Sequence, residues 1–466
     1  MESTQQSDRQ TYRAIVLGQG GNELLLARVG AAFLLPSVEI PRWQRLAENM
    51  TAAIRNEWHQ EAICLFNPSV SALVTSADEL NYQVMECYGP TKSHPRAEWV
   101  PVLSVSERTF VDSADLVAVR RALTNCDRHE GAVAPGPFAR LGWFRELQTW
   151  IGEVIEPLGF HLTGSFSQFN ASPSFSLVRF ETSGPAVWFK AVGKPNLCEF
   201  PITLELARFF PQYLPPILAS RPDWNGWLAL EVEGISLGET QDIRHWKAAA
   251  SALAKLQMES SDRSGVLIDS GARDLRTPAL LELIRPFLDA MGQLMEEQTK
   301  VPPPALPRSE LMLLGEQIEE ALCLSTDLGI PDSLGHLDLN PGNVIVSEGQ
   351  SVFLDWAEAY LGNPLFSYQY LAEHLRHLSS MGVTAGSVLT TAYAEEWRSL
   401  VSSASLQEAL VLSPLLTVFA YATATDAWGD QARLQQPKVA GYLRSLTRRM
   451  HREANRLSDR GALCSN

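Results

Sequence analysis

Two short stretches decide how this chain is interpreted: GHLDLNPGNVIV, residues 335–346, and VFLDWAEA, residues 352–359. Asp338 and Asn343 lie on one turn, and Asp355 follows after a single short hairpin, so three oxygen-bearing side chains converge. Magnesium prefers oxygen ligands and is usually held by one or two carboxylates together with substrate phosphates. In phosphoryl transfer a separate carboxylate accepts the proton of the attacking hydroxyl. The pattern predicts Asp338 as the base, and Asn343 and Asp355 as the metal ligands.

The segments HLDLNPGN and LDW resemble the catalytic and metal-binding segments of the aminoglycoside phosphotransferase family, whose members share the protein-kinase fold. The family's first segment usually reads His-Gly-Asp-x-x-x-x-Asn, and this chain has Leu337 where Gly is usual, which leaves the roles intact. The resemblance implies a catalytic turn braced by hydrogen bonds of His336. It also implies ATP and Mg²⁺ as cofactors, and transfer of the γ-phosphoryl group to a hydroxyl of a small molecule.

The same resemblance implies an α+β, bilobal kinase-like fold with a β-rich small lobe (residues 140–233) and a helical large lobe (residues 234–466). The family needs a lysine on a small-lobe strand to hold the α- and β-phosphates, and a helix glutamate to orient it. AVWFKAVG supplies Lys190 at the end of an apolar strand, and Glu199 opens the following helix. We favour Glu199 as its partner over Glu205, which lies nearly two turns further along.

The nucleotide contacts are predicted from two further segments. In TGSFSQFNASPSFSLVRF, residues 163–180, Gly164 and Ser165 are small enough to let the backbone approach phosphate. In LALEVEGISL, residues 228–237, a strand meets a glycine, and we expect the backbone of Glu231 to Glu233 to bind adenine at a hinge between the lobes.

Residues 1–126 form a separate α+β pattern, followed by a Gly- and Pro-rich linker at 127–139. Its order of strand, hairpin and helix resembles a Nudix hydrolase domain, with an α/β/α arrangement. Aligning Arg55 with the arginine of that family's metal-binding helix places neutral or basic residues where glutamates should stand, at Asn56, His59 and Gln60. Glu57 and Glu61 fall out of register. We therefore expect a degenerate, non-catalytic Nudix-like domain.

Composition limits the partners of the chain. With 466 residues, a net charge of −15 and a pI near 5.1, it has no general affinity for nucleic acid or anionic lipid, because both bind through clustered Lys and Arg. The six cysteines are scattered singly, which is typical of reduced thiols in the cytoplasm. The longest uncharged run, between Glu408 and Asp426, contains polar residues and predicts a buried helix, not a membrane span.

A small acceptor is favoured over a protein. A protein kinase needs about 20 to 30 residues after its metal aspartate to position a peptide. Here the helical pattern resumes near Phe366, close behind Asp355. The acidic balance favours a cationic or neutral acceptor, and candidate lining residues are Trp246, Asp274, Glu358, Glu373, His374 and Trp428.

The main alternative is a pseudoenzyme that uses the fold for nucleotide binding or scaffolding without turnover. The intact set Lys190, Asp338, Asn343 and Asp355 argues against it, because buried polar groups are costly unless they are paired or metal-bound.

Overall fold

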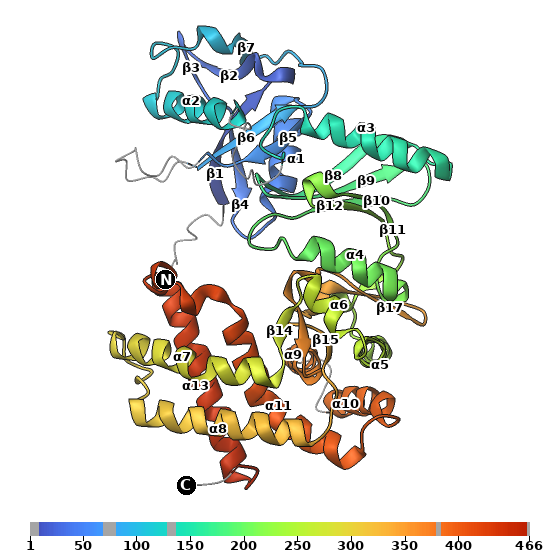
Figure 1. Ribbon diagram of the computed structural model, residues 1–466. Helices are drawn as coiled ribbons and strands as arrows, with labels where there is room; N and C mark the ends of the chain where they lie inside the picture. The colour runs from blue at the N-terminus through green and yellow to red at the C-terminus, as the bar shows by residue number, and fades with distance from the viewer. Residues whose placement is uncertain (1–8, 69–80, 128–136, 379–383, 464–466) are drawn as a thin grey trace, which may run out of the picture. The chain divides into compact units, whose positions relative to one another are not determined.

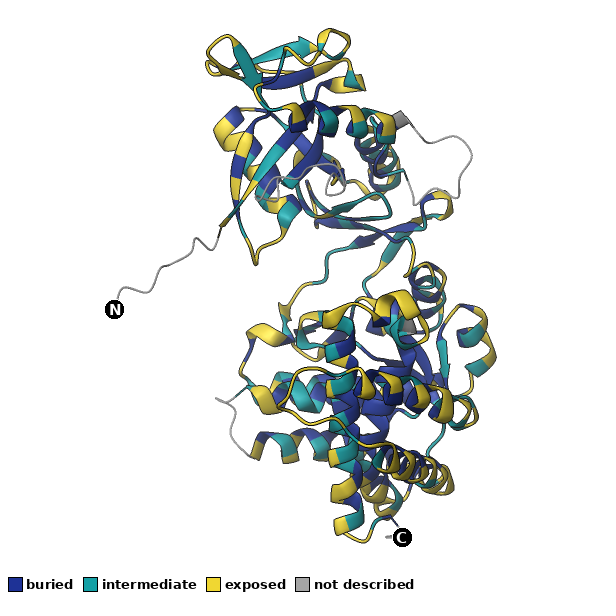
Figure 2. Ribbon diagram, turned by 90° about the vertical axis from the view of Figure 1, so that its left-hand side faces the viewer, coloured by how far each residue is buried: buried dark blue, intermediate teal, exposed yellow. Residues whose placement is uncertain are grey.

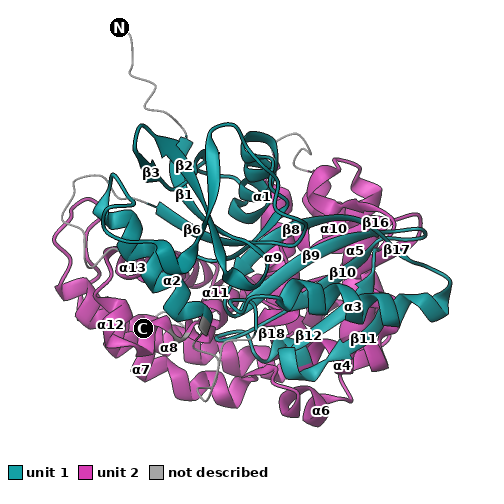
Figure 3. Cartoon of the chain, turned by 90° about the horizontal axis from the view of Figure 1, so that it is seen from above, with its two compact units in different colours: residues 1–200, 216–231 teal, residues 201–215, 232–466 magenta. Residues whose placement is uncertain are grey.

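The computed structural model describes residues 9–68, 81–127, 137–378 and 384–463 (Figure 1). The chain divides into two compact units, residues 1–200 with 216–231 and residues 201–215 with 232–466 (Figure 3). The first unit contains both the predicted N-terminal domain and most of the predicted small lobe. The division after Glu231 falls inside the segment predicted as a hinge. Most of the predicted linker, 127–139, lies outside the described residues.

The first part of unit 1 is a seven-stranded sheet with the order β3-β2-β1-β6-β5, to which β4 adds on β1 and β7 on β2. Strands β1 and β6 are parallel and the other pairs are antiparallel. The strands are β1 (Arg9–Leu17), β2 (Glu23–Val29), β3 (Ala32–Leu34), β4 (Ser37–Pro41), β5 (Ala62–Phe66), β6 (Asn81–Cys87) and β7 (Ala97–Pro101). The helices of this part are α1 (Leu46–Trp58) and α2 (Ser113–Asp127).

Alternation along β1 explains why helices cover both faces of this sheet. Ala14 and Val16 belong to the core cluster that contains the buried face of α1. Ile15 and Leu17 belong to the cluster that contains buried residues of α2. Successive side chains of a strand point to opposite faces, so an unbroken apolar run places one hydrophobic layer on each side. The result is a helix-sheet-helix arrangement; its Nudix-like character stays a prediction.

The second part of unit 1 is a five-stranded antiparallel sheet with the order β11-β12-β10-β9-β8. Its elements are α3 (Trp143–Ile155), β8 (Leu162–Ser172), β9 (Phe175–Thr182), β10 (Val187–Ala191), β11 (Ile217–Arg221) and β12 (Gly226–Leu230), and α4 (Glu199–Phe209) begins in this unit. Val187 and Phe189 pack in the same core as the buried face of α3. Lys190 alternates with them and therefore lies on the face of the sheet opposite α3.

Unit 2 is mainly helical, with two three-stranded sheets of order β13-β16-β17 and β14-β18-β15. Its strands are β13 (Ile235–Ser236), β14 (Arg273–Leu275), β15 (Ser333–His336), β16 (Val344–Ser347), β17 (Gln350–Phe353) and β18 (Ala359–Gly362). The helices are α5 (Ile243–Ser260), α6 (Ser264–Asp269), α7 (Thr277–Glu296), α8 (Arg308–Asp327), α9 (Leu365–His377), α10 (Thr384–Trp397), α11 (Ser403–Ala424), α12 (Gln431–Leu434) and α13 (Pro437–Asp459). Figure 2 shows the buried residues gathered in the interior of each unit.

Helix α11 contains the long uncharged run of the sequence. By length and composition it is the one helix among the described residues that qualifies as a candidate membrane span, and 56% of its most apolar window is buried inside the protein. It contacts α8, α9 and α13. Its apolar residues, Leu415, Leu416 and Phe419 among them, belong to one of the two core clusters of unit 2.

A buried polar network ties the first sheet to α2. Asp115 is fully buried and accepts hydrogen bonds from Arg13 Nη1 (2.5 Å), from Tyr82 Oη (3.1 Å) and from the backbone N–H of Leu35 (3.1 Å). Burial, with the charge of Asp115, raises the pKa of Tyr82 well above its ordinary value, so this hydroxyl remains a donor. The Asp115 carboxylate, the Tyr82 hydroxyl and the Leu35 N–H each have a partner, as buried polar groups require.

We predict that Asp115→Asn lowers the free energy of unfolding by about 3 kcal/mol, because Arg13 loses its buried counter-charge and the new amide group turns an N–H toward a donor. Urea denaturation measures this loss. The matched control is Glu296→Gln, which breaks the exposed pair with Arg308 (2.8 Å) and is expected to cost less than about 1 kcal/mol. Equal losses in the two variants would contradict the importance of the network.

Candidate active site

The segment after β15 folds into a turn closed by its own asparagine. Asn340 Oδ1 accepts a hydrogen bond from the N–H of Gly342 (2.9 Å), which caps the short 3-10 helix Pro341–Asn343. The N–H of Asn343 bonds to the carbonyl of Asn340 (2.9 Å), and the N–H of Asn340 bonds to the carbonyl of Asp338 (2.8 Å). Side-chain caps of this kind replace the missing helical partners. The turn therefore fixes Asp338 and Asn343 relative to each other.

The carboxylate of Asp338 is held by three side chains. Asn340 Nδ2 and Tyr370 Oη both donate to Oδ1, at 3.1 and 3.3 Å, while Asn343 Nδ2 lies 3.4 Å from Oδ2 and 2.9 Å from the carbonyl oxygen of Asp338. Burial and the neighbouring Asp338 raise the pKa of Tyr370 to about 12, so it stays protonated and able to donate. The Asn343 amide nitrogen is engaged with Asp338, and its oxygen is the atom with cation-binding chemistry.

Asp355 is brought to the same turn by the β16–β17 hairpin. Val344 pairs with Phe353, and the N–H of Leu354 donates to the carbonyl of Asn343 (2.8 Å). Asp355 itself has φ 63° and ψ 63°, a left-handed conformation that is rare outside glycine and is often found at functional sites. The structure thus brings Asp338, Asn343 and Asp355 together.

The turn carries excess negative charge. Burial raises the pKa of Glu358 above its usual range, and the charges of Asp338 and Asp355 add to that rise while Arg273 opposes it. Among the described residues no cluster of three or more His, Cys, Asp and Glu side chains has the arrangement of a metal site. An Asn-plus-Asp donor set fits magnesium, which takes its remaining ligands from phosphates and water.

His336 links the two halves of the site. It is fully buried; its Nδ1 accepts the backbone N–H of Asp338 (3.1 Å), and its Nε2 lies 3.0 Å from the carbonyl oxygen of Leu354. With Nδ1 as the acceptor, the ring proton sits on Nε2 and is donated to Leu354. This geometry suits the bracing role predicted from the sequence.

A second layer supports the strand that carries His336. Ser367 Oγ accepts the N–H of His336 (2.7 Å) and lies 3.0 Å from Tyr360 Oη, which in turn bonds the carbonyl of Asn363 (2.9 Å). A Cβ at Gly335 would lie 1.9 Å from the Tyr360 ring, so only glycine fits beside it. Asn363 therefore belongs to the contacts that support this strand.

Lys190 and Glu199 form an ion pair within unit 1. Glu199 is 1% exposed. The Lys190 ammonium lies over two aromatic rings, 5.9 Å from the ring centroid of Phe175 and 5.8 Å from that of Trp227. The alternative partner, Glu205, pairs instead with Arg208 at 3.6 Å. Of the two glutamates considered from the sequence, the structure places Glu199 beside Lys190.

Gly164 and Ser165 are not brought to Lys190. They lie in the irregular part of β8 between Leu162 and Phe166, and Phe166 pairs with Phe180 at the far end of the hairpin. Lys190 is level with Leu177, which pairs with Asn170 close to the hairpin turn. The turn nearest to Lys190 is 172–175, and a strand register of this kind depends on a bulge that the sequence pattern does not reveal.

The side chain of Glu231 is engaged within the small-lobe sheet. It forms a paired contact with Arg179 (2.5 and 2.7 Å) and accepts a hydrogen bond from Trp188 Nε1 (3.1 Å). The Glu231 N–H bonds to the carbonyl of Ala186 (2.9 Å). Glu233 is exposed and belongs to unit 2, so the two glutamates lie on either side of the division between the units.

A cavity of about 600 Å³ in unit 2 is lined by two of the six residues that the sequence suggested for acceptor binding. Asp274 and Trp428 line it, with Arg273, whose guanidinium pairs with Glu358 near the catalytic turn. The other candidates lie elsewhere: Trp246 is a fully buried core residue, Glu373 pairs with Arg449 (2.5 Å), and His374 packs against the ring of Tyr370 (4.9 Å).

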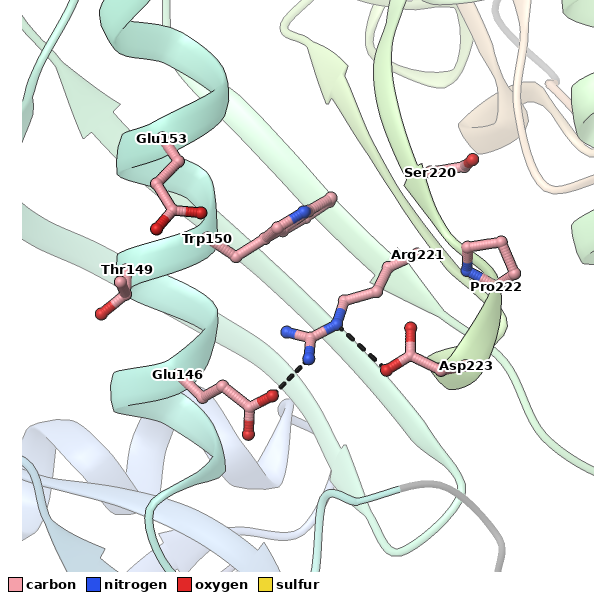
Figure 4. Close-up of a pocket in the computed structure, with 8 residues that line it drawn as sticks. All are labelled: Glu146, Thr149, Trp150, Glu153, Ser220, Arg221, Pro222 and Asp223. Atoms are coloured by element: carbon pink, nitrogen blue, oxygen red, sulfur yellow. Dashed lines mark hydrogen bonds and ion pairs between the residues drawn. The ribbon is translucent and has the colours of Figure 1, made fainter.

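Another cavity, of about 560 Å³, lies in unit 1 between α3 and the end of β11 (Figure 4). Arg221 crosses it, pairing with Glu146 and with Asp223 (3.4 Å), and its guanidinium lies 3.5 Å from the Trp224 ring centroid. Because α3 covers the face of the sheet opposite Lys190, this cavity is separate from the lysine site. Of its charged lining residues, Glu146 and Asp223 both pair with Arg221.

Residues 215–398 match the model of the phosphotransferase enzyme family. The matched part is less than half of the chain and contains the whole turn from Asp338 to Asn343, together with Asp355. No curated protein sequence matches the chain.

Several solved structures are similar. The macrolide 2'-phosphotransferase from Brachybacterium faecium shares 17% identity with a TM-score of 0.43, covering 64% of this chain and 98% of that one. The choline kinase from Streptococcus pneumoniae shares 15% identity with a TM-score of 0.42, covering 67% and 99%. The ethanolamine kinase from Plasmodium vivax shares 10% identity with a TM-score of 0.46, covering 72% and 95%.

We predict that Ser367→Ala destabilises unit 2 by about 1–2 kcal/mol, because the buried N–H of His336 loses its acceptor. The free energy of unfolding from urea titration measures the effect. Ser387→Ala is the matched control, since the Ser387 hydroxyl is exposed and only donates to the carbonyl of Thr384 (2.8 Å). A loss no larger than that of the control would contradict the supporting role of Ser367.

Proposed function

We propose that the protein is a magnesium-dependent phosphotransferase that moves the γ-phosphoryl group of ATP to a hydroxyl of a small molecule. The observation that carries this proposal is the convergence of Asp338, Asn343 and Asp355 on one rigid turn. That turn lies inside the segment that matches the phosphotransferase enzyme family.

Asp338 is proposed as the group that orients the acceptor hydroxyl and takes its proton. Its Oδ1 already accepts hydrogen bonds from Asn340 and Tyr370, whereas Oδ2 has only the longer contact with Asn343. Oδ2 is therefore the oxygen suited to receive the proton. Because the carboxylate is held by three side chains, the hydroxyl is positioned without further reorganisation, which is the main source of rate in phosphoryl transfer.

The ionic groups have complementary proposed roles. Asn343 and Asp355 would hold Mg²⁺, which supplies neutralisation of the phosphate charge when it is bound. Lys190, held by Glu199, would bind the α- and β-phosphates. Glu231 and Glu233 would border the adenine through their backbone groups. Gly164 and Ser165 lie at the end of the β8–β9 hairpin that is far from Lys190. The turn 172–175, at the other end, is therefore proposed to contact the phosphates in their place.

The cavity beside β14 is proposed to receive the acceptor. It offers an aromatic and aliphatic wall from Trp428, Leu275 and Leu283 together with charged groups of both signs, Asp274 and Arg433 among them. The excess of carboxylates at the neighbouring turn favours a neutral or cationic acceptor over an anionic one.

Residues 1–126 are proposed to be a Nudix-like domain without hydrolase activity. Helix α1 ends at Trp58, and His59 caps it in a left-handed conformation. Gln60 is fully buried, with its amide donating to the carbonyls of Trp58 (2.9 Å) and Lys92 (2.8 Å). A magnesium site needs carboxylates at these places. Cys64, Cys87 and Cys323 are free thiols, which supports the proposed cytoplasmic location.

Turnover of ATP against a panel of small hydroxylated compounds tests the proposal, with ADP release as the readout. We predict that Asp338→Asn lowers kcat by at least about 100-fold, because the amide cannot take the proton, while ATP affinity changes by less than about five-fold. Asp327→Asn is the matched control, because it alters an exposed carboxylate at the end of α8 and should leave both values unchanged.

Absence of ADP release with every compound, despite normal nucleotide binding, would favour the pseudoenzyme alternative. Retention of wild-type turnover by Asp338→Asn would instead remove Asp338 from the role of base.

A further inference from the structure

A buried polar side chain, Gln168, links the small-lobe sheet to the N-terminal domain. Gln168 lies on β8, is 1% exposed, and faces β5 of the seven-stranded sheet. Its Nε2 donates to the carbonyl of Cys64 (2.9 Å), and its Oε1 accepts the N–H of Cys64 (2.9 Å). The Gln168 amide therefore satisfies both backbone groups of Cys64, as a neighbouring strand would.

The place of Cys64 explains why this pairing matters. Strand β5 is at one end of its sheet and, among the described residues, pairs with β6 alone, so its outward N–H and C=O groups need other partners. A buried backbone group without a partner costs about 1–3 kcal/mol. Gln168 provides the partners at Cys64 and closes this edge against β8.

Two further contacts flank Gln168 on the same strand. The guanidinium of Arg45, at the start of α1, lies 4.8 Å from the ring centroid of Phe169. Ala171 packs against the apolar cluster that contains the buried face of α1. The pairing of β8 with β9 shifts by one residue between Gln168 and Asn170, so the anchored stretch is also the site of a bulge. The N-terminal domain thus holds the last part of β8.

That part of β8 leads directly to the turn beside Lys190. Asn170 pairs with Leu177, which pairs with Lys190 on the next strand. Beyond them, the Phe175 ring lies 5.9 Å from the Lys190 ammonium. A Cβ at Gly193 would lie 2.4 Å from the Ser174 Cβ, so the turn 172–175 is in close contact with the chain after β10.

We propose that Gln168 is a positioning residue for nucleotide binding, and that the N-terminal domain forms the fixed support of the β8–β9 hairpin beside Lys190. The proposal rests on the proposed function of Lys190 in binding phosphates. Strand β8 is the last strand in the order of its sheet, and ordering its end and the adjoining turn when the nucleotide binds would cost free energy. The amide of Gln168 anchors the hairpin before the nucleotide binds. The free energy of ordering the hairpin is therefore spent during folding and does not reduce the affinity for the nucleotide.

The test compares Gln168→Leu with Gln83→Leu. Gln83 is also buried and lies on β6. It donates two hydrogen bonds to backbone carbonyls, those of Phe66 (3.0 Å) and Val84 (3.1 Å), and both of these partners lie in the seven-stranded sheet and not in the hairpin. The two substitutions therefore remove equivalent groups from the same unit. The full chain is used for hydrogen exchange over 170–177 and for titration with a non-hydrolysable ATP analogue and Mg²⁺.

We predict that Gln168→Leu speeds exchange over 170–177 by at least about ten-fold and weakens analogue binding by about three- to ten-fold, because both buried backbone groups of Cys64 lose their partner. Gln83→Leu should leave both values within about two-fold, even if its thermal stability falls equally. If Gln168→Leu does not fold, Arg45→Ala replaces it, since Arg45 is exposed, with Arg55→Ala on the same helix as its control.

Equal exchange over 170–177 in the two glutamine variants would overturn the anchoring role. Faster exchange with unchanged analogue affinity would overturn the positioning role. Failure of the wild-type protein to bind the analogue would refute the proposed function itself, and it is detected before any variant is compared. The exchange data would then still report whether Gln168 holds the hairpin.

Discussion

The geometry of the turn that carries Asp338 and Asn343 depends on the imidazole ring of His336. His336 accepts the N–H of Asp338 on one side and donates to the carbonyl of Leu354 on the other, so it sets the spacing between the proposed base and the proposed metal ligand Asp355. The distance between the charged groups of Asp338 and Asp355 stays fixed only if the backbone that carries them is rigid. The hydrogen bond from the Leu354 N–H to the carbonyl of Asn343 is a second link between the same two segments, made through the β16–β17 hairpin.

The N-terminal domain gives the chain its second distinctive feature. One hydrophobic cluster contains buried residues of β1, α2, α3 and the β9–β10 part of the small-lobe sheet. A shared core of this kind makes the two sheets a single compact unit, although a linker separates them in the sequence. The shared core therefore gives the N-terminal domain a structural role within unit 1.

Some features of the site follow from the sequence and others do not. Asp338, Asn343 and Asp355 were found because a turn and one short hairpin bring them together, whatever the rest of the chain does. The position of Gly164 and Ser165 depends on the bulges of β8, which shift the register without changing the apolar pattern. Tyr370 and Gln168 reach their partners only through tertiary packing, so no local motif marks them. Asn340 is part of the motif GHLDLNPGNVIV, but only the structure shows that its side chain caps the short 3-10 helix.

The most direct test of the central claim is isothermal titration of the purified protein with a non-hydrolysable ATP analogue, with and without Mg²⁺, for the wild type and for Asp355→Ala. We predict magnesium-dependent binding in the wild type that falls by at least about ten-fold in the variant, because a carboxylate ligand is lost. Binding that is independent of magnesium, or equally strong in both proteins, would contradict the assignment of Asp355 and with it the proposed chemistry of the turn.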